Sequence, residues 1–267
     1  MAMTINTNVV SLNAQRNLTT SQSSLATSMQ RLSSGLRVNS AYDDAAGMAI
    51  ADRMNAQIRG INVAVRNAND GISLAQTAEG ALATITDALQ RMRELAVQSL
   101  NGSNGSGDRS NLNTEYQQLS AEITRIAAQT KFNGTAIVGA SAGAQTFQVG
   151  ANVGDTLTIT TTQMTTVAGD ILDTTNANTA LTAIDAKLDV VNTSRATYGA
   201  AMSRFSMAIQ NLQISSENQA AARGRIMDAD FAAETANLSR AQILQQAGSA
   251  MVAQANQLPN QVLALLR

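Results

Sequence analysis

Apolar residues return in alternating steps of four and three along most of this chain. That spacing places them on one side of an α-helix, and it is typical of long helices that pack along a shared seam. The pattern therefore predicts a mainly α-helical protein, built as a long antiparallel helical bundle or coiled coil. The clearest series are Leu25, Met29, Leu32 and Leu36; Met54, Ile58, Ile61, Val65, Ala68, Ile72 and Ala75; Leu82, Ile85, Leu89, Met92 and Ala96; Ile184, Leu188 and Val191; and Leu244, Gly248, Met251, Ala255, Leu258, Val262 and Leu265.

The composition favours such helices over a compact enzyme core. Hydrophobic residues make up 44% of the 267 residues, but aromatic residues only 3%. Small and aliphatic side chains suit the seams between helices. The chain contains neither cysteine nor histidine, which removes disulfides, thiolate ligands, and the commonest general base and metal ligand. We expect no enzyme activity, no cofactor and no metal site.

Charge and hydropathy exclude two further classes of partner. The 18 basic and 19 acidic residues leave a net charge of -1, so the positive surface that nucleic-acid binding requires is missing. No apolar run is long enough to span a bilayer, and we expect no membrane insertion. The opening segment "MAMTINTNVVSLNAQ" lacks the basic and apolar parts of a secretory signal. A protein of this kind would leave the cell by another route.

Three interruptions divide the helical pattern. Gly35, Asn39 and Ser40 loosen the chain before Asp43 and Asp44, whose carboxylates are suited to cap the next helix. The cluster from 101 to 107 predicts a turn, after which a shorter antiparallel helix follows. The segment 132–175 is rich in glycine and β-branched residues and predicts a small β-hairpin region.

These interruptions give a palindromic layout. Residues 1–43 and 227–267 form the two halves of a terminal helical domain, and residues 44–226 form a helical trunk that carries the β region at about 132–175. The first and last helices are expected to pair, with the β region at the far tip of the trunk.

Other motifs have plain structural interpretations. The segment "NGSNGSGD" lacks the lysine and the flanking elements of a phosphate-binding loop, so we interpret it as a turn. Asp228 and Asp230 are expected to cap a helix junction and not to bind a metal. The threonine-rich run 156–166 fits an exposed hairpin whose hydroxyl groups could accept sugars.

The last helical series suggests a surface for self-assembly. From Ala241 to Leu266 the chain carries no charge although apolar residues recur, and one seam within the chain would contribute too little to order such a helix. Pro259 predicts a kink or a local break near Ala255. The residues expected to form the assembly surface are Ile5, Val9, Leu12, Leu244, Met251, Leu258, Val262 and Leu265.

The segment "RLSSGLRVNSAYDDAAGMAIADRM", residues 31–54, closely resembles the N-terminal signature of bacterial flagellins. Four other segments match the same family in the same order: "LQRMRELAVQS", "QTKFNG", "FQVGANVGDT" and the tail "QANQLPNQVLALLR". The resemblance implies a subunit of the extracellular flagellar filament, with terminal helices in an inner tube and the trunk in an outer tube. Because only a short segment separates "KFNG" from the helical pattern that resumes at Leu181, the family's variable outer domains are expected to be absent.

The resemblance also implies partners. These are other copies of the chain, the filament cap and hook-junction proteins, an export chaperone at the C-terminal helix, and a host Toll-like receptor that senses flagellin. Export would run through the flagellar channel without a cleaved signal peptide. The residues that correspond to the family's receptor-binding segment are Gln90, Arg91, Leu95 and Glu115.

Two alternatives remain open from the sequence. A hook-filament junction protein shares the terminal helices, and another self-assembling secreted coiled-coil protein would share the seams. An enzyme would need a carboxylate or lysine site in the β region, which the absence of histidine disfavours.

Overall fold

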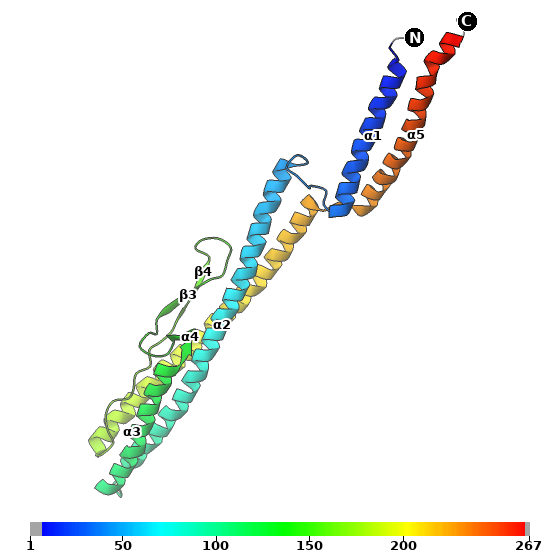
Figure 1. Cartoon of the computed structure of the whole chain (residues 1–267). Coiled ribbons are helices and arrows are strands. Elements are labelled where there is room, and N and C mark those ends of the chain that lie inside the picture. Colours follow the sequence, from blue (N-terminus) through cyan, green and yellow to red (C-terminus); the bar gives the residue numbers. More distant parts are fainter. Residues whose placement is uncertain (1–6, 265–267) are drawn as a thin grey trace. The chain divides into compact units, whose positions relative to one another are not determined.

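The computed structural model describes residues 7–264, with side chains described through Gln257. It confirms a mainly α-helical fold with two small pairs of antiparallel strands (Figure 1). In chain order the elements are α1 (Val9–Ser34), α2 (Ala45–Ser99), α3 (Ser106–Gln129), β1 (Lys131–Phe132), β2 (Thr135–Ala136), β3 (Ala144–Gln148), β4 (Thr156–Thr160), α4 (Thr174–Met227) and α5 (Phe231–Ala264).

The chain packs as two compact units. One contains residues 1–56 and 218–267, and the other, which we call the trunk, contains residues 57–217. Both limits fall inside the long helices α2 and α4, whereas the sequence placed its domain boundaries at the helix ends, at 43/44 and 226/227. The domain boundaries at 43/44 and 226/227 stay a prediction. Each of the two compact units is described separately below.

In the first unit, α1 packs along α5, which confirms the predicted pairing of the first and last helices. We call these two helices the terminal pair. Gly248 brings them close together, since a Cβ atom at this position would lie 3.1 Å from Leu18 Cδ1. Ser11 Oγ donates to Asn256 Oδ1 at 2.7 Å, so polar groups also join the two helices.

Pro259 does not break α5, which is helical through Ala264. The expected local break near Ala255 is therefore wrong. A proline has no amide hydrogen, so Pro259 cannot donate to the carbonyl of Ala255 four residues earlier. The side chain of Asn8 replaces that donor, because its Nδ2 lies 2.7 Å from Ala255 O. Asn8 also caps α1, accepting from Ser11 N at 3.0 Å.

The segment between α1 and α2, residues 35–44, pairs with the chain at the junction of α4 and α5, residues 227–230. Arg37 N donates to Met227 O at 2.6 Å, and Ala229 N donates to Gly35 O at 2.9 Å. The side chain of Arg37 donates to Ile226 O at 2.7 Å and so satisfies a carbonyl at the end of α4. Main-chain hydrogen bonds therefore join the connection between α1 and α2 to the connection between α4 and α5.

Two of the four aspartates predicted to cap helices, Asp44 and Asp230, do so at the starts of α2 and α5. Asp44 Oδ1 accepts from Gly47 N at 2.8 Å, and Asp230 Oδ1 accepts from Ala232 N at 2.9 Å. Asp43 holds the preceding turn, because its Oδ2 accepts from the amides of Asn39 and Ser40. These hydrogen bonds favour the carboxylate and lower the pKa of Asp43.

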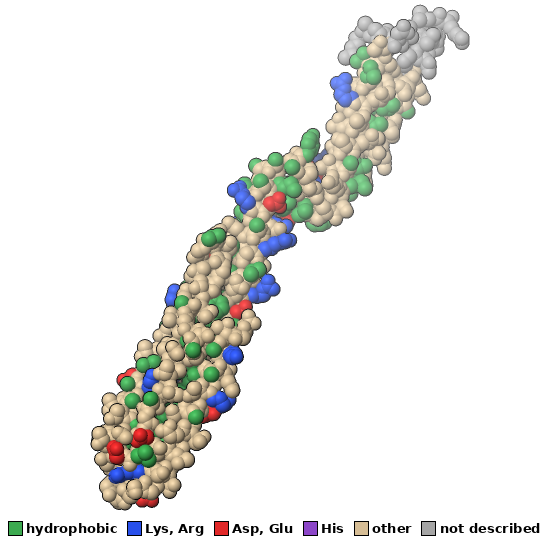
Figure 2. Space-filling model, turned by 60° about the vertical axis from the view of Figure 1, so that its left-hand side comes forward, with side chains coloured by type: hydrophobic (Ala, Val, Ile, Leu, Met, Phe, Trp, Pro, Cys, Tyr) green, Lys and Arg blue, Asp and Glu red, His purple; other side chains and the backbone are tan. Residues whose placement is uncertain are grey.

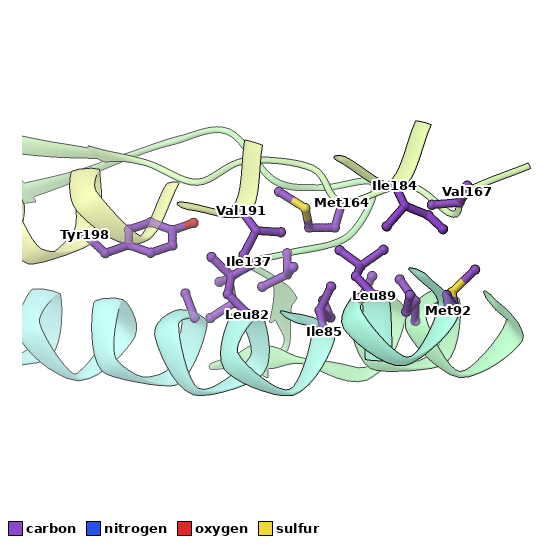
Figure 3. Packing of buried hydrophobic residues seen from close by; sticks show 14 of the residues in the cluster. Leu82, Ile85, Leu89, Met92, Ile137, Met164, Val167, Ile184, Val191 and Tyr198 are labelled. Atoms are coloured by element: carbon purple, nitrogen blue, oxygen red, sulfur yellow. The ribbon is translucent and has the colours of Figure 1, made fainter. Parts of the chain in front are cut away.

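The trunk has a continuous apolar core. α2 runs antiparallel to α3 and α4 (Figure 1), and the predicted seam residues of α2 from Leu82 to Ala96 are almost completely buried. Figure 3 shows Leu82, Ile85, Leu89 and Met92 of α2 facing Ile184, Val191 and Tyr198 of α4.

An extended segment, residues 161–173, completes this core. Met164, Val167 and Ile171 are buried in it. Side chains of α3 hold the segment by its main chain: Gln117 Nε2 donates to Gly169 O at 2.8 Å, and Asn113 Oδ1 accepts from Ile171 N at 3.1 Å. The expectation of an exposed hairpin over 156–166 is thus wrong after Thr160, because the chain leaves β4 and enters the core.

The hairpin of β3 and β4 lies along the side of α2 and not beyond its end, which differs from the expected place at the far tip (Figure 1). Asn67 Nδ2 on α2 donates to Gln148 O at 3.0 Å. Phe147 of β3 packs edge-on against Phe205 of α4, with ring centroids 5.7 Å apart. Gly71 of α2 leaves room for the ring of Phe205, since a Cβ atom at Gly71 would lie 2.9 Å from Phe205 Cζ.

Candidate assembly and recognition surfaces

The fully buried side chains of the terminal pair are small or polar, and several of its large apolar ones are exposed. The buried residues of α1 are Ser11 and Ser28, and the described buried residues of α5 are Glu234, Ala241 and Ala255. By contrast, the exposed fractions of the predicted assembly residues are 64% for Val9, 52% for Leu12, 49% for Leu244 and 62% for Met251. Two helices share only one interface, so a second apolar face is left uncovered.

An open groove follows this interface. Its apolar part has a volume of about 380 Å³ and is lined by residues that include Val10, Ala14, Leu244, Gly248 and Met251. Figure 2 shows apolar side chains on the outside of the terminal pair, among few charged ones. Within residues 9–30 the one charged side chain is Arg16, and residues 241–264 have none. The surface is therefore apolar and almost uncharged.

The neighbouring part of the groove is polar. It is lined by hydroxyl groups of α1, among them Thr20, Ser24 and Thr27, and by an ion pair between Arg31 and Glu234 at 3.7 Å. Glu234 is only 8% exposed. This ion pair links α1 to α5 beside the apolar part of the groove.

Four predicted assembly residues cannot be placed. Ile5 and Leu265 lie outside the residues that the structure describes, and Leu258 and Val262 belong to the part of α5 whose side chains are not described. Their part in assembly stays a prediction.

Three of the four predicted receptor-binding residues lie on the trunk surface. Gln90, Arg91 and Glu115 are exposed. Arg91 Nε donates to Glu115 Oε1 at 2.8 Å, which links α2 to α3. Arg91 also donates to Glu94 Oε2 at 2.9 Å. Both hydrogen bonds favour the charged guanidinium and raise the pKa of Arg91 above its usual range.

Leu95 does not share this surface, and its assignment needs correction. Its side chain is fully buried in the trunk core, so it cannot touch a receptor while the trunk is folded as described. Glu94, which is absent from the predicted set, joins this surface through its ion pair with Arg91. Its position three residues after Arg91 on one helix was the available signal, since such pairs meet on a helix surface.

The described residues contain neither a cluster suited to a metal ion nor a membrane-spanning helix. Among residues 7–264, no three acidic, histidine or cysteine side chains gather as a metal site would need. No helix in the described part of the chain is long and apolar enough to cross a membrane.

A trunk with its own core and a terminal pair with an uncovered apolar face are the features of a self-assembling structural protein. Comparison with known families gives the particular one. The model for the bacterial flagellin N-terminal helical region matches residues 5–142, and the model for the bacterial flagellin C-terminal helical region matches residues 181–266. The chain belongs to the bacterial flagellin family.

Similar proteins of known identity support the assignment to the flagellin family. The chain is 47% identical over 272 residues to a flagellin of Halalkalibacterium halodurans, an alignment that covers 99% of this chain and all of the relative. It is 35% identical to flagellin A of Vibrio cholerae over 379 residues, covering both chains fully. The crystal structure of Bacillus cereus flagellin matches with a TM-score of 0.51 and 34% identity, over 55% of this chain and 88% of that one.

These findings establish the function at the level of the family. The chain is a structural subunit that polymerises into the helical bacterial flagellar filament used for motility, and the hook-filament junction protein is not favoured. The alignment with the Vibrio flagellin is more than a hundred positions longer than this chain. That excess agrees with the expectation that this chain lacks large outer domains.

Proposed function

We propose that the uncovered apolar face of the terminal pair is the surface through which subunits join. The observation that carries this proposal is the exposure of Val9, Leu12, Leu244 and Met251 on two helices whose fully buried side chains are all small or polar. Burying one such side chain contributes about 1.5–3 kcal/mol. A few of them per subunit, repeated along a polymer, are enough to favour assembly.

Seeded polymerisation of a Leu244→Lys variant tests this proposal. A lysine ammonium in a packed apolar interface costs several kcal/mol unless it reaches water, so we expect no sedimenting filaments. Leu244→Met keeps the apolar volume and should still polymerise. Gln246→Lys adds the same charge at an exposed polar position of α5 and serves as the charge control. Normal filaments from Leu244→Lys would refute this role of the face.

The same terminal surface would serve the other partners of a flagellin. The filament cap and the hook-junction proteins would contact subunits at the two ends of the polymer, and an export chaperone would cover the apolar face of α5 before assembly. Export would use the flagellar channel without a cleaved signal peptide, and the chain would have no enzyme activity. The absence of charge over residues 241–264 supports a chaperone that binds by apolar contact.

Recognition by a host Toll-like receptor would use the trunk face around Gln90, Arg91 and Glu115. An arginine held by two carboxylates is oriented before it meets a partner and can still offer its remaining donors. We expect Arg91→Ala to reduce receptor activation by free subunits strongly in a reporter-cell assay. Arg125→Ala is the matched control, because Arg125 is an exposed trunk arginine paired with Glu122. Equal activation by both variants would overturn the assignment.

A further inference from the structure

The surface of the trunk carries three asparagine-glycine pairs in different surroundings. Asn101-Gly102 and Asn104-Gly105 lie in the turn between α2 and α3, and Asn133-Gly134 forms the turn between β1 and β2. The first two occur in the same tripeptide, Asn-Gly-Ser. Local sequence therefore hardly distinguishes them, and any difference in their chemistry must come from the structure.

The reaction open to such pairs is intramolecular deamidation. The backbone nitrogen of glycine loses its proton and attacks Cγ of the asparagine; a nitrogen-carbon bond forms, the Cγ–Nδ2 bond breaks, and ammonia leaves. Water then adds to one of the two carbonyl carbons of the cyclic imide and opens the ring to aspartate or isoaspartate. Glycine favours the attack because it has no Cβ in the way. The nitrogen must be free of hydrogen bonds, and the side chain must be free to approach it.

Neither condition holds at Asn104. Gly105 N donates to Asp108 Oδ2 at 3.0 Å as part of the start of α3. Asn104 Nδ2 donates to Gln98 O at 2.7 Å. Both hydrogen bonds must break before Gly105 N can reach Asn104 Cγ, and the side chain is half-buried.

Asn133 is restrained by its backbone. Its φ is 48° and that of Gly134 is 83°, which are the left-handed values of a two-residue hairpin turn. The strands on either side are paired, with Phe132 opposite Thr135. Rotation of the Gly134 nitrogen toward the side chain would disturb this pairing.

At Asn101 the attacking nitrogen is free, and Nδ2, which must leave, donates to no acceptor within the described residues. Asn101 and Gly102 are exposed, and within the described residues the amide of Gly102 donates to no acceptor. Asn101 Oδ1 accepts from Ser103 N at 3.3 Å, which keeps the side chain folded over the peptide that must attack it. We propose that Asn101 is the site of spontaneous deamidation in this protein, with water as the only reagent.

The reaction would change this turn. Arg109 Nη2 lies 3.5 Å from Asn101 O, so the new carboxylate forms beside a guanidinium. An isoaspartate would add an atom to the main chain where Asn101 O accepts from Asn104 N at 3.2 Å. Each converted subunit gains one negative charge on the trunk surface, so an old filament becomes a mixture of charged forms.

Incubation of the full-length protein at mildly alkaline pH tests the proposal. Peptide mapping by mass spectrometry follows all three pairs, and enzymatic methylation of isoaspartate confirms the product. Because a hydrogen bond of this kind is equivalent to about a tenfold change in population, we expect Asn101 to react roughly ten times faster than Asn104. In denaturant the two should react at similar rates. A folded protein in which Asn104 keeps pace with Asn101 would overturn the proposal.

Two variants tie the result to the geometry. Gly102→Ala adds a Cβ that meets no atom within 4 Å, so it should leave the fold intact and slow the reaction at Asn101. Asp108→Ala releases Gly105 N and should speed the reaction at Asn104 but not at Asn101. An unchanged Asn101 rate in Gly102→Ala would count against attack by this nitrogen.

Discussion

The terminal pair and the trunk have the same apolar spacing in sequence and the opposite burial in structure. In α2 the residues at this spacing, such as Leu82 and Leu89, are buried, whereas Leu12 of α1 and Leu244 of α5 are about half exposed. The trunk surrounds α2 with α3, α4 and the segment 161–173. The terminal pair offers each helix a single neighbour. The number of elements around a helix, and not its own pattern, decides whether its apolar face is satisfied within one chain.

The largest expected effect is in the trunk. Leu89→Ala removes a side chain from the fully buried core, and such truncations cost about 2–5 kcal/mol. Leu12→Ala on α1 removes the same atoms from an exposed position, so it should leave the unfolding of the free subunit nearly unchanged. Thermal unfolding of both variants measures the difference. Equal losses would mean that the terminal face is already covered in the single chain.

Two glycines of α2 sharpen the description of the trunk. Gly71→Ala places a methyl group against the ring of Phe205, and overpacking of this kind costs about 1–3 kcal/mol. Gly80→Ala meets nothing within 4 Å and should stabilise the helix by about 0.5–1 kcal/mol. Opposite shifts in melting temperature are expected, and shifts of the same sign would contradict the packing of Phe205 on α2.

Asn8 tests how the terminal pair is held together. Asn8→Ala removes the cap of α1 and the donor to Ala255 O, and loss of a helix cap costs about 0.5–2 kcal/mol. Pro259→Ala should partly rescue this variant, because the new amide can donate to the carbonyl that Asn8 leaves. Hydrogen exchange over residues 9–34 in filaments of the single and double variants, where these amides are expected to be protected, reports the loss and the rescue. No rescue would show that Asn8 acts only as a cap.

The smallest effect concerns a tyrosine in the trunk core. Burial, with the nearby charge of Asp170, raises the pKa of Tyr116 from 10.0 to about 12. The folded trunk thus keeps a proton that the unfolded chain loses above pH 10, and stability should fall as the pH rises between these values. The Tyr116 hydroxyl has no partner in the described structure, so Tyr116→Phe should fold normally and show a weaker loss at high pH.

The control for this variant is Tyr42→Phe, since the side chain of Tyr42 is exposed. Melting temperatures across this pH range should depend on pH in this control as in the parent protein. If Tyr116→Phe also kept the parent's pH dependence, Tyr116 would not carry the effect.

Much of this fold could be predicted from the sequence, because helix seams and helix starts are local features. The capping by Asp44 and Asp230 follows from residue type and position alone. Leu95 could not be placed in this way. A seam of two residues per heptad includes Ala96 and leaves Leu95 outside, but three elements pack around α2, so a wider arc that includes both residues is buried.

The wrong predictions for the hairpin over 156–166 and for the helix break at Pro259 both involve contacts between residues distant in sequence. The segment 161–173 has no regular structure, and its burial depends on α3 side chains such as Asn113 and Gln117. The effect of Pro259 depends on Asn8, which lies at the other end of the chain. No periodicity in either segment reveals these partners.

Hydrogen exchange in free subunits and in filaments tests the central contrast most directly. The account predicts that amides of residues 9–34 and 231–257 exchange rapidly in the free subunit and become strongly protected in the filament, while the core amides of α2 around Leu82 and Leu89 are protected in both. Equal protection of the terminal pair in the two states would contradict it, because the apolar face would then not need neighbouring subunits.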